Sequence, residues 1–123
     1  MSKEAPGSIS EGPSGQGAGA PTLLIVDDDA PLRRRLAQAM EARGFVVTTA
    51  DSVAAGVAAA SVTPPAFAVV DLRLGDGSGI DVVAALQQAR PDARIVVLTG
   101  YGNIATAVAA VKAGAVDYLP KPA

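Results

Sequence analysis

The stretch AFAVVDLRLGDGSG, residues 66–79, contains a short apolar run that stops at a carboxylate. Residues 67–70 are all apolar, Asp71 follows them, and a glycine-rich segment comes next. A continuous apolar run of this length is typical of a strand that is buried on both faces of a sheet. One aspartate at a strand end is often an ordinary loop residue. Its meaning therefore depends on which residues end the other strands.

The composition limits the classes of function. The chain has 123 residues, of which 50% are hydrophobic, so it fits one domain with a substantial core. It contains no cysteine and no histidine, which excludes disulfides, thiol chemistry, histidine-dependent catalysis and metal sites built from these ligands. Metal binding through oxygen ligands remains open. The net charge of −2, without a long basic run, does not indicate a non-specific nucleic-acid surface.

The first 21 residues differ from the rest of the chain. They are rich in Gly, Ser, Pro and Ala and have almost no large apolar side chain, which predicts a disordered tail over residues 1–21 and a folded domain over residues 22–123. The start of the chain lacks the apolar core of a signal peptide, and no apolar run is long enough to cross a bilayer. We therefore expect a cytoplasmic protein without a membrane partner.

From residue 22 onward, apolar runs of strand length alternate with segments of helical character. This alternation predicts an α/β fold in which helices cover both faces of a parallel sheet. The predicted strands are residues 22–27, 45–50, 66–71, 94–99 and 115–121, and the predicted helices are residues 30–44, 51–60, 79–90 and 103–114.

Reactive side chains follow several of these strands. In an open parallel sheet, ligands bind at the carboxyl ends of the strands. The first strand leads into Asp27 and Asp28, the third ends at Asp71, the fourth at Thr99, and the fifth near Lys121. In the strand order of a doubly wound sheet, the first and third strands are neighbours. The three aspartates would then lie in one pocket.

These residue types suit the transfer of a phosphoryl group. Crowded carboxylates repel one another unless a cation lies between them, and Mg²⁺ binds oxygen ligands and phosphate alike. Thr99 would donate a hydrogen bond to a phosphate, Lys121 would supply a positive charge, and Asp71 would act as the nucleophile. Phosphoryl transfer needs positioning and charge neutralisation more than an acid–base group, which agrees with the absence of histidine.

Four motifs at the strand ends resemble those of one known family. The chain resembles the receiver domain of bacterial two-component response regulators over residues 22–123. Within that family, residues 26–45 and 98–123 are similar to the redox-responsive global regulators of proteobacteria, the RegA/PrrA/ActR type. The four motifs are IVDDD (25–29), VVDLRL (69–74), VVLTGYG (96–102) and AGAVDYLPKP (113–122).

The resemblance implies a doubly wound, five-stranded parallel sheet of strand order 2-1-3-4-5. Members of the family close this sheet with a fifth helix, and no segment for that helix follows before Ala123. We therefore expect a receiver domain that lacks its C-terminal helix and exposes apolar residues of its last strands. Burial stabilises by about 25 cal/mol per Å² of apolar surface, so such a chain is expected to be less stable than the complete domain.

The resemblance also implies a role for each acidic residue. Asp71 is the expected phosphoacceptor. Asp28 and Asp71 bind Mg²⁺ through side-chain oxygens, the Arg73 backbone carbonyl is a third ligand, and Asp27 acts through water.

Other residues are expected to contact the phosphoryl group. By the resemblance, the side chains of Thr99 and Lys121 do so, together with the backbone N–H groups of Leu72 and Gly100. Tyr118 takes the position of an aromatic switch residue, which moves inward when Thr99 moves toward the phosphoryl group.

The implied function is a phosphorylation switch rather than an enzyme. A sensor histidine kinase would donate the phosphoryl group, and the chain would assist its own phosphorylation and dephosphorylation. The conformational change would control transcription through a DNA-binding output domain that this sequence does not contain. A stand-alone receiver or phosphorelay module is the alternative. A phosphatase that forms an aspartyl phosphate is less consistent with the sequence, because Arg73 stands where such enzymes have a second aspartate.

Two further segments have competing interpretations. The glycines of GDGSG (75–79) resemble a dinucleotide-binding loop, but Ile80 stands where the last glycine would be needed, so we expect a loop that bends around the metal. The helix predicted over residues 103–114 is apolar almost all round, which favours a partner surface. We expect a homodimer through this fourth helix and the fifth strand, the alternative being that alanine is simply tolerated there.

Overall fold

A five-stranded parallel sheet forms the centre of the computed structural model, which describes residues 19–100 and 104–121. The order is β2-β1-β3-β6-β7. Since β6 and β7 are the fourth and fifth strands expected from the sequence, the predicted order 2-1-3-4-5 is confirmed. The strands of the sheet are β1 Thr22–Val26, β2 Val46–Ala50, β3 Phe67–Asp71, β6 Arg94–Thr99 and β7 Asp117–Pro120.

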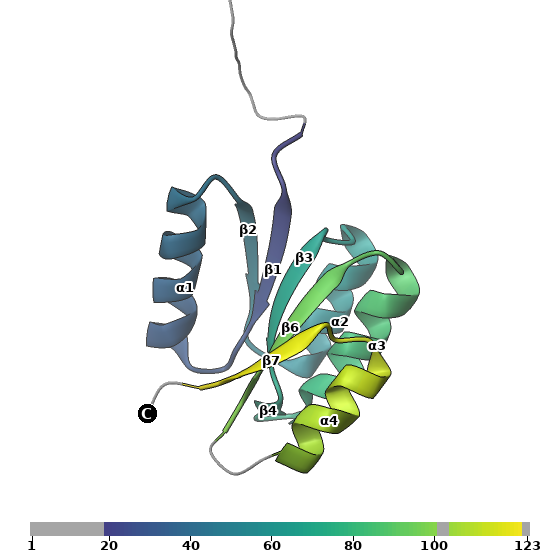
Figure 1. The fold of residues 1–123 in the computed structure, drawn as a ribbon. Helices are drawn as coiled ribbons and strands as arrows, with labels where there is room; N and C mark the ends of the chain where they lie inside the picture. The colour runs from purple at the N-terminus through teal and green to yellow at the C-terminus, as the bar shows by residue number, and fades with distance from the viewer. Residues whose placement is uncertain (1–18, 101–103, 122–123) are drawn as a thin grey trace, which may run out of the picture.

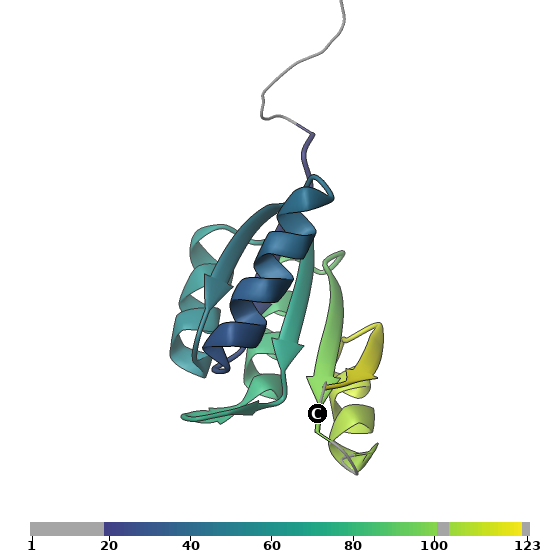
Figure 2. The same ribbon diagram turned by 90° about the vertical axis from the view of Figure 1, so that its left-hand side faces the viewer.

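Helices lie on both faces of this sheet. In Figures 1 and 2, α1 covers one face at β1 and β2, and the other three helices cover the opposite face. Within the part of the chain that the structure describes, no helix is both long enough and apolar enough to cross a membrane. The helices are α1 Ala30–Ala42, α2 Val53–Val62, α3 Gly79–Ala89 and α4 Ile104–Ala113.

The main core lies between the sheet and α2–α4. Alternate strand residues point to this side, including the fully buried Val26, Val70 and Val97. Tyr118 of β7 also packs on this side, so its neighbour Leu119, which is 52% exposed, points toward the other face. Among the described residues, α1 is the only helix on that other face.

A short hairpin follows β3 where the sequence predicts only a loop. Strands β4 (Arg73–Leu74) and β5 (Gly77–Ser78) pair in antiparallel fashion. Gly77 has a φ of 152°, which side-chain-bearing residues rarely adopt, so glycine allows the chain to reverse here. The hairpin projects past the carboxyl ends of the strands in Figure 2 and forms one side of the site described next.

Helix α4 packs one apolar side against the core, and part of its solvent-facing side is also apolar. Ala107 and Ala110 are fully buried against the core, whereas Ile104, Val108 and Val111 are 57%, 44% and 41% exposed. These three residues recur at helical spacing and form an apolar stripe. Asn103, the first residue of the helix predicted over residues 103–114, lies outside the described residues.

Candidate functional site

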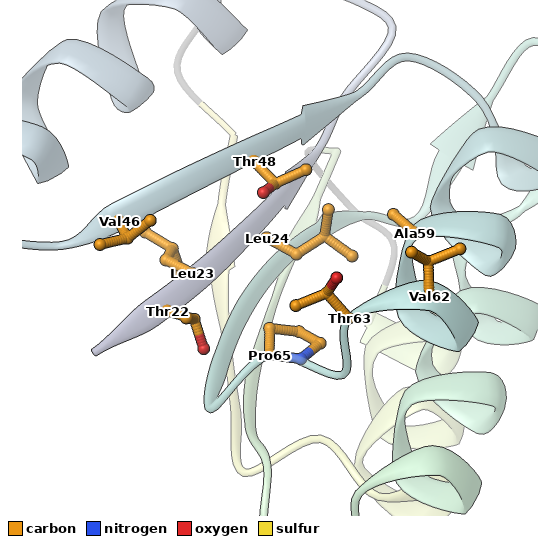
Figure 3. A pocket seen from close by; sticks show the side chains of 9 residues that line it. All are labelled: Thr22, Leu23, Leu24, Val46, Thr48, Ala59, Val62, Thr63 and Pro65. Atoms are coloured by element: carbon orange, nitrogen blue, oxygen red, sulfur yellow. The ribbon is translucent and has the colours of Figure 1, made fainter. Parts of the chain in front are cut away.

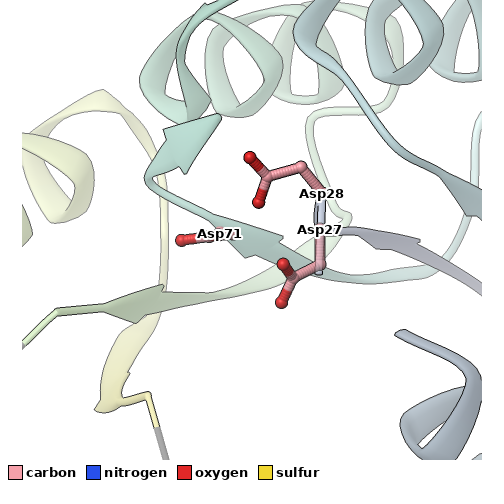
Figure 4. A group of neighbouring side chains, drawn as sticks. All are labelled: Asp27, Asp28 and Asp71. Atoms are coloured by element: carbon pink, nitrogen blue, oxygen red, sulfur yellow. The ribbon is translucent and has the colours of Figure 1, made fainter. Parts of the chain in front are cut away.

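Three carboxylates meet at the carboxyl ends of β1 and β3. Asp27, Asp28 and Asp71 each offer an oxygen, and these oxygens all lie within 4.8 Å of one another (Figure 4). The cause is the strand register. Val26 of β1 pairs with Val70 of β3, so the next residues along the two segments, Asp27 and Asp71, lie side by side at the edge of the sheet. The predicted cluster of three aspartates is thus present.

Lys121, which follows the last strand of the sheet, joins this cluster. Its Nζ donates hydrogen bonds to Asp71 Oδ2 at 2.7 Å and to Asp27 Oδ1 at 3.0 Å. The backbone N–H of Lys121 donates to the Thr99 carbonyl at 2.8 Å, which continues the pairing of β7 with β6 beyond Pro120. The lysine is therefore held by the sheet itself.

Burial dominates the electrostatics of Asp71. This residue is 2% exposed, and desolvation raises the pKa of its carboxyl above the ordinary value. The hydrogen bonds from Lys121 and from the Arg73 backbone lower the pKa by less, and the nearby charge of Asp27 raises it further. The site thus holds a carboxylate whose charge is only partly compensated.

The pKa of the Lys121 ammonium is also raised, but for a different reason. Burial acts to lower its pKa, but the hydrogen bonds with Asp71 and Asp27, together with their charges, outweigh burial and raise the pKa. Lys121 accordingly stays charged beside the carboxylates.

The donor set suits a hard divalent cation. All the clustered ligand atoms are carboxylate oxygens, and one ammonium cannot neutralise three carboxylates. Asp27 is fully buried, and its Oδ2 has no hydrogen-bond partner among the residues that the structure describes. A buried carboxylate oxygen without a partner is costly, and a cation or its bound water would satisfy it. The residues present therefore fit a divalent metal.

The site residues predicted on the fourth and fifth strands lie at or near the carboxyl edge of the sheet, where the aspartates meet. Asp71 pairs with Leu98, so Thr99 is one residue further along β6 and lies beside the acidic cluster, 5% exposed. The Thr99 hydroxyl donates to the Gly100 carbonyl at 3.1 Å. Tyr118 is half-buried on the α4 side of the sheet. The roles of Thr99, Gly100 and Tyr118 stay predictions.

One predicted phosphate donor has a hydrogen-bond partner within the sheet, and its role stays a prediction. The N–H of Leu72 donates to the Leu98 carbonyl at 3.0 Å, because the hydrogen-bond ladder between β3 and β6 continues one residue past Asp71. It therefore points into the sheet and not into the site. The next N–H, that of Arg73, turns back and donates to Asp71 Oδ1 at 3.2 Å. Arg73 thus supplies a backbone donor to the Asp71 carboxylate.

Arg33 is a residue of the site that the sequence did not reveal. Its guanidinium donates from Nη1 to the backbone carbonyl of Asp27 at 2.8 Å. This contact holds the end of β1 against the first turns of α1. The only signal in the sequence is that Arg33 lies in the first turns of the helix after the aspartates. Many arginines occupy such positions without contacting a site.

A second concavity lies at the opposite end of the sheet. It has a volume of about 180 Å³ and is lined by residues at the starts of β1 and β2 and at the end of α2, among them Leu24, Val46 and Val62 (Figure 3). None of its lining residues is charged, so it lacks the chemistry of the acidic site.

Comparison with known sequences agrees with this geometry. A family model described as "Response regulator receiver domain" matches residues 23–123. The photosynthetic apparatus regulatory protein RegA of Rhodovulum sulfidophilum is 71% identical over 103 residues, covering 84% of this chain and 56% of that protein. The acid tolerance regulatory protein ActR of Sinorhizobium medicae is 67% identical over 102 residues, covering 83% and 53%. The chain thus spans about half the length of these curated relatives.

Solved structures share the fold. A response regulator protein from Burkholderia pseudomallei, crystallised with a phosphorylated aspartic acid, a calcium ion and citrate, is 45% identical with a TM-score of 0.78, covering 84% of this chain and 61% of that one. A CheY-like receiver domain protein from Methanospirillum hungatei is 28% identical with a TM-score of 0.80, covering 85% and 84%. The fold, the acidic cluster and these similarities agree: the chain belongs to the family of response regulator receiver domains.

Proposed function

We propose that this chain accepts a phosphoryl group on Asp71 in a reaction that requires Mg²⁺. The observation that carries the proposal is the buried Asp71 carboxylate, which Lys121 and the Arg73 N–H hold in place beside Asp27 and Asp28. The phosphorylated aspartic acid and calcium ion of the similar Burkholderia structure support this chemistry.

The proposed step is an in-line substitution at phosphorus. A carboxylate oxygen of Asp71 forms a new bond to phosphorus while the phosphorus–nitrogen bond of a phosphohistidine donor, which carries a proton on its other ring nitrogen, breaks and leaves an acyl phosphate and a neutral imidazole. Mg²⁺ held by Asp28, Asp71 and the Arg73 carbonyl, with Asp27 acting through water, would neutralise the charge of the transferred group.

Other groups of the chain would bind the phosphoryl oxygens and carry the conformational change. Lys121 carries its charge 2.7 Å from Asp71, where it would stabilise the oxygens of the phosphoryl group in transfer. Thr99 and the Gly100 N–H would bind a phosphoryl oxygen on the β6 side, and the movement of Thr99 would allow Tyr118 to turn inward. Phosphorylation would thereby shift an equilibrium between two conformations.

We propose that the donor is a sensor histidine kinase and that the chain is not an enzyme acting on a separate substrate. Arg73 supports this view against an aspartyl-phosphatase, because a guanidinium stays protonated and cannot serve as the general acid–base group that such an enzyme needs. In the longer protein, phosphorylation would control transcription through a DNA-binding output domain in the cytoplasm.

The proposed homodimer would use α4 and β7. Ile104, Val108 and Val111 form an exposed apolar stripe on α4, and Val116, just before β7, is 50% exposed. A second copy of the chain would bury this stripe. Sedimentation of the phosphorylated chain should show a dimer that Val108→Asp weakens at unchanged phosphorylation. A monomer under all conditions would contradict this part of the proposal.

The acceptor residue is tested by chemical trapping. Borohydride reduces an aspartyl phosphate to homoserine, so peptide mapping after phosphorylation and reduction identifies the modified position. We expect homoserine at residue 71. Homoserine at position 27 or 28, or a stable phosphate on a hydroxyl side chain, would contradict the assignment.

A further inference from the structure

Asp76, at the tip of the hairpin after β3, reaches across to the start of α2. Its Oδ1 accepts a hydrogen bond from the Val53 N–H at 2.8 Å, and its Oδ2 accepts one from the Ala54 N–H at 3.1 Å. The two segments are more than 20 residues apart in sequence. The contact therefore ties two separate loops together at the edge of the acidic site.

The start of α2 needs these acceptors. The first N–H groups of a helix have no partner within the helix. Ser52 serves the third one, because its Oγ accepts from the Ala55 N–H at 3.0 Å, but the first turn of α2 contains no acidic residue of its own. Asp76 supplies the missing negative charge, and the two backbone hydrogen bonds lower the pKa of its carboxyl.

The other end of the hairpin is fixed to the acidic site. The Arg73 N–H donates to Asp71 Oδ1 at 3.2 Å, and a Cβ on Gly75 would lie 3.9 Å from Asp28 Oδ2. The Gly79 N–H donates to the Leu72 carbonyl at 3.0 Å, and a Cβ on Gly79 would overlap the Asp71 backbone carbonyl. A displacement of the hairpin tip would therefore also shift the groups that contact the carboxylates of Asp71 and Asp28.

We propose that Asp76 is a positioning residue for the metal site. By binding the start of α2, it holds the hairpin, and with it the Arg73 backbone, in place beside Asp71 and Asp28, the residues that would bind the metal. This inference rests on the proposed function, because it concerns the same metal. It differs from a simple helix cap, because a cap would stabilise α2 without changing the affinity for a cation.

The experiment compares Asp76→Ala, Asp76→Asn and a control, Asp92→Ala. Asp92 is an exposed aspartate whose side chain pairs with the neighbouring Arg90 at 3.3 Å, so it matches Asp76 in charge but not in position. Mg²⁺ affinity is measured by NMR titration of the folded proteins, and the acetyl phosphate reaction is followed over a range of Mg²⁺ concentrations.

We expect Asp76→Ala to weaken Mg²⁺ binding by about 10-fold, at the lower end of what the loss of a residue supporting a metal ligand costs. Asp76→Asn keeps a carbonyl oxygen as acceptor and should lie between Asp76→Ala and wild type, and Asp92→Ala should equal wild type. The reaction of Asp76→Ala should need more Mg²⁺ but reach the wild-type rate at saturation. A lower melting temperature with unchanged Mg²⁺ affinity would overturn the proposal.

A second readout needs no metal. Amide hydrogen exchange of Arg73 should become faster in Asp76→Ala and stay unchanged in Asp92→Ala, because the hairpin loses one of its two attachments. Unchanged exchange at Arg73 would overturn the positioning role. If wild type bound no Mg²⁺, the proposed metal chemistry would fail, whereas this exchange measurement would still decide whether Asp76 holds the hairpin.

Discussion

Lys121 Nζ lies 2.7 Å from Asp71 Oδ2, although the two residues are 50 positions apart in the sequence. The contact joins the last strand of the sheet to the central strand β3. Because the same ammonium also contacts Asp27 at 3.0 Å, it holds two buried carboxylates that would otherwise repel each other. The stability of the metal-free site and its reactivity thus depend on the same lysine.

Lys121→Met should destabilise the metal-free protein and slow its phosphorylation. The loss of the ammonium leaves Asp27 and Asp71 without this donor, at a cost of about 1–3 kcal/mol in the free energy of unfolding. Mg²⁺ should restore more stability to this variant than to wild type. Denaturant unfolding with and without Mg²⁺ measures both effects.

Lys112→Met is the matched control, since Lys112 is an exposed lysine on α4. It should leave the free energy of unfolding and the rate of phosphorylation unchanged. Equal effects of the two substitutions would show that net charge, and not the contact with Asp71, explains the result.

Asp71→Asn should stabilise the metal-free protein at pH 7. In the folded state the pKa of Asp71 is raised above 3.8, so ionisation costs stability as the pH rises through that folded-state pKa. The neutral amide avoids this cost. The advantage of Asp71→Asn should shrink as the pH falls toward 3.8, and thermal melts at several pH values measure it.

Addition of Mg²⁺ provides the control for this prediction. Wild type should gain more stability than Asp71→Asn, because the amide is a weaker ligand for a hard cation. A variant that is less stable than wild type at pH 7 without metal would contradict a raised pKa of Asp71 in the folded state.

Gly79→Ala should destabilise the domain and disturb the phosphorylation site. A methyl group at this position would overlap the backbone carbonyl of Asp71, so either α3 or the end of β3 must shift, at a cost of about 2–4 kcal/mol. Gly75→Ala, in the hairpin that precedes α3, is the control, because its methyl group would meet nothing closer than Asp28 Oδ2 at 3.9 Å. Similar unfolding free energies for the two variants would be inconsistent with the close approach at Gly79.

The strands and the residues that end them were predictable from patterns within single segments, whereas the sheet order that brings Asp27, Asp28 and Asp71 together was implied by the resemblance to receiver domains. Apolar runs mark the strands, and residues such as Asp71 come directly after them. Parallel strands then bring the ends of those segments to one edge. Such reasoning needs no knowledge of individual contacts.

Contacts between segments were not predictable from the same patterns. The sequence does not show that the hydrogen-bond ladder continues through Leu72, whose N–H donates to Leu98, or that the Arg73 N–H turns back to Asp71. Nor does it show that Asp76 caps α2, because the two segments approach only after the hairpin has formed. Both depend on hydrogen-bond geometry that only the folded chain defines.

The central claim is that Asp71 accepts a phosphoryl group when Mg²⁺ is bound. The most direct measurement is the intact mass of wild type and Asp71→Asn after incubation with acetyl phosphate, with and without Mg²⁺, with circular dichroism of each sample to show that it is folded. We predict the addition of one phosphoryl group to wild type in Mg²⁺ and none under the other conditions. A folded wild-type protein that gains no mass in Mg²⁺, or an Asp71→Asn variant that gains the same mass, would contradict the account.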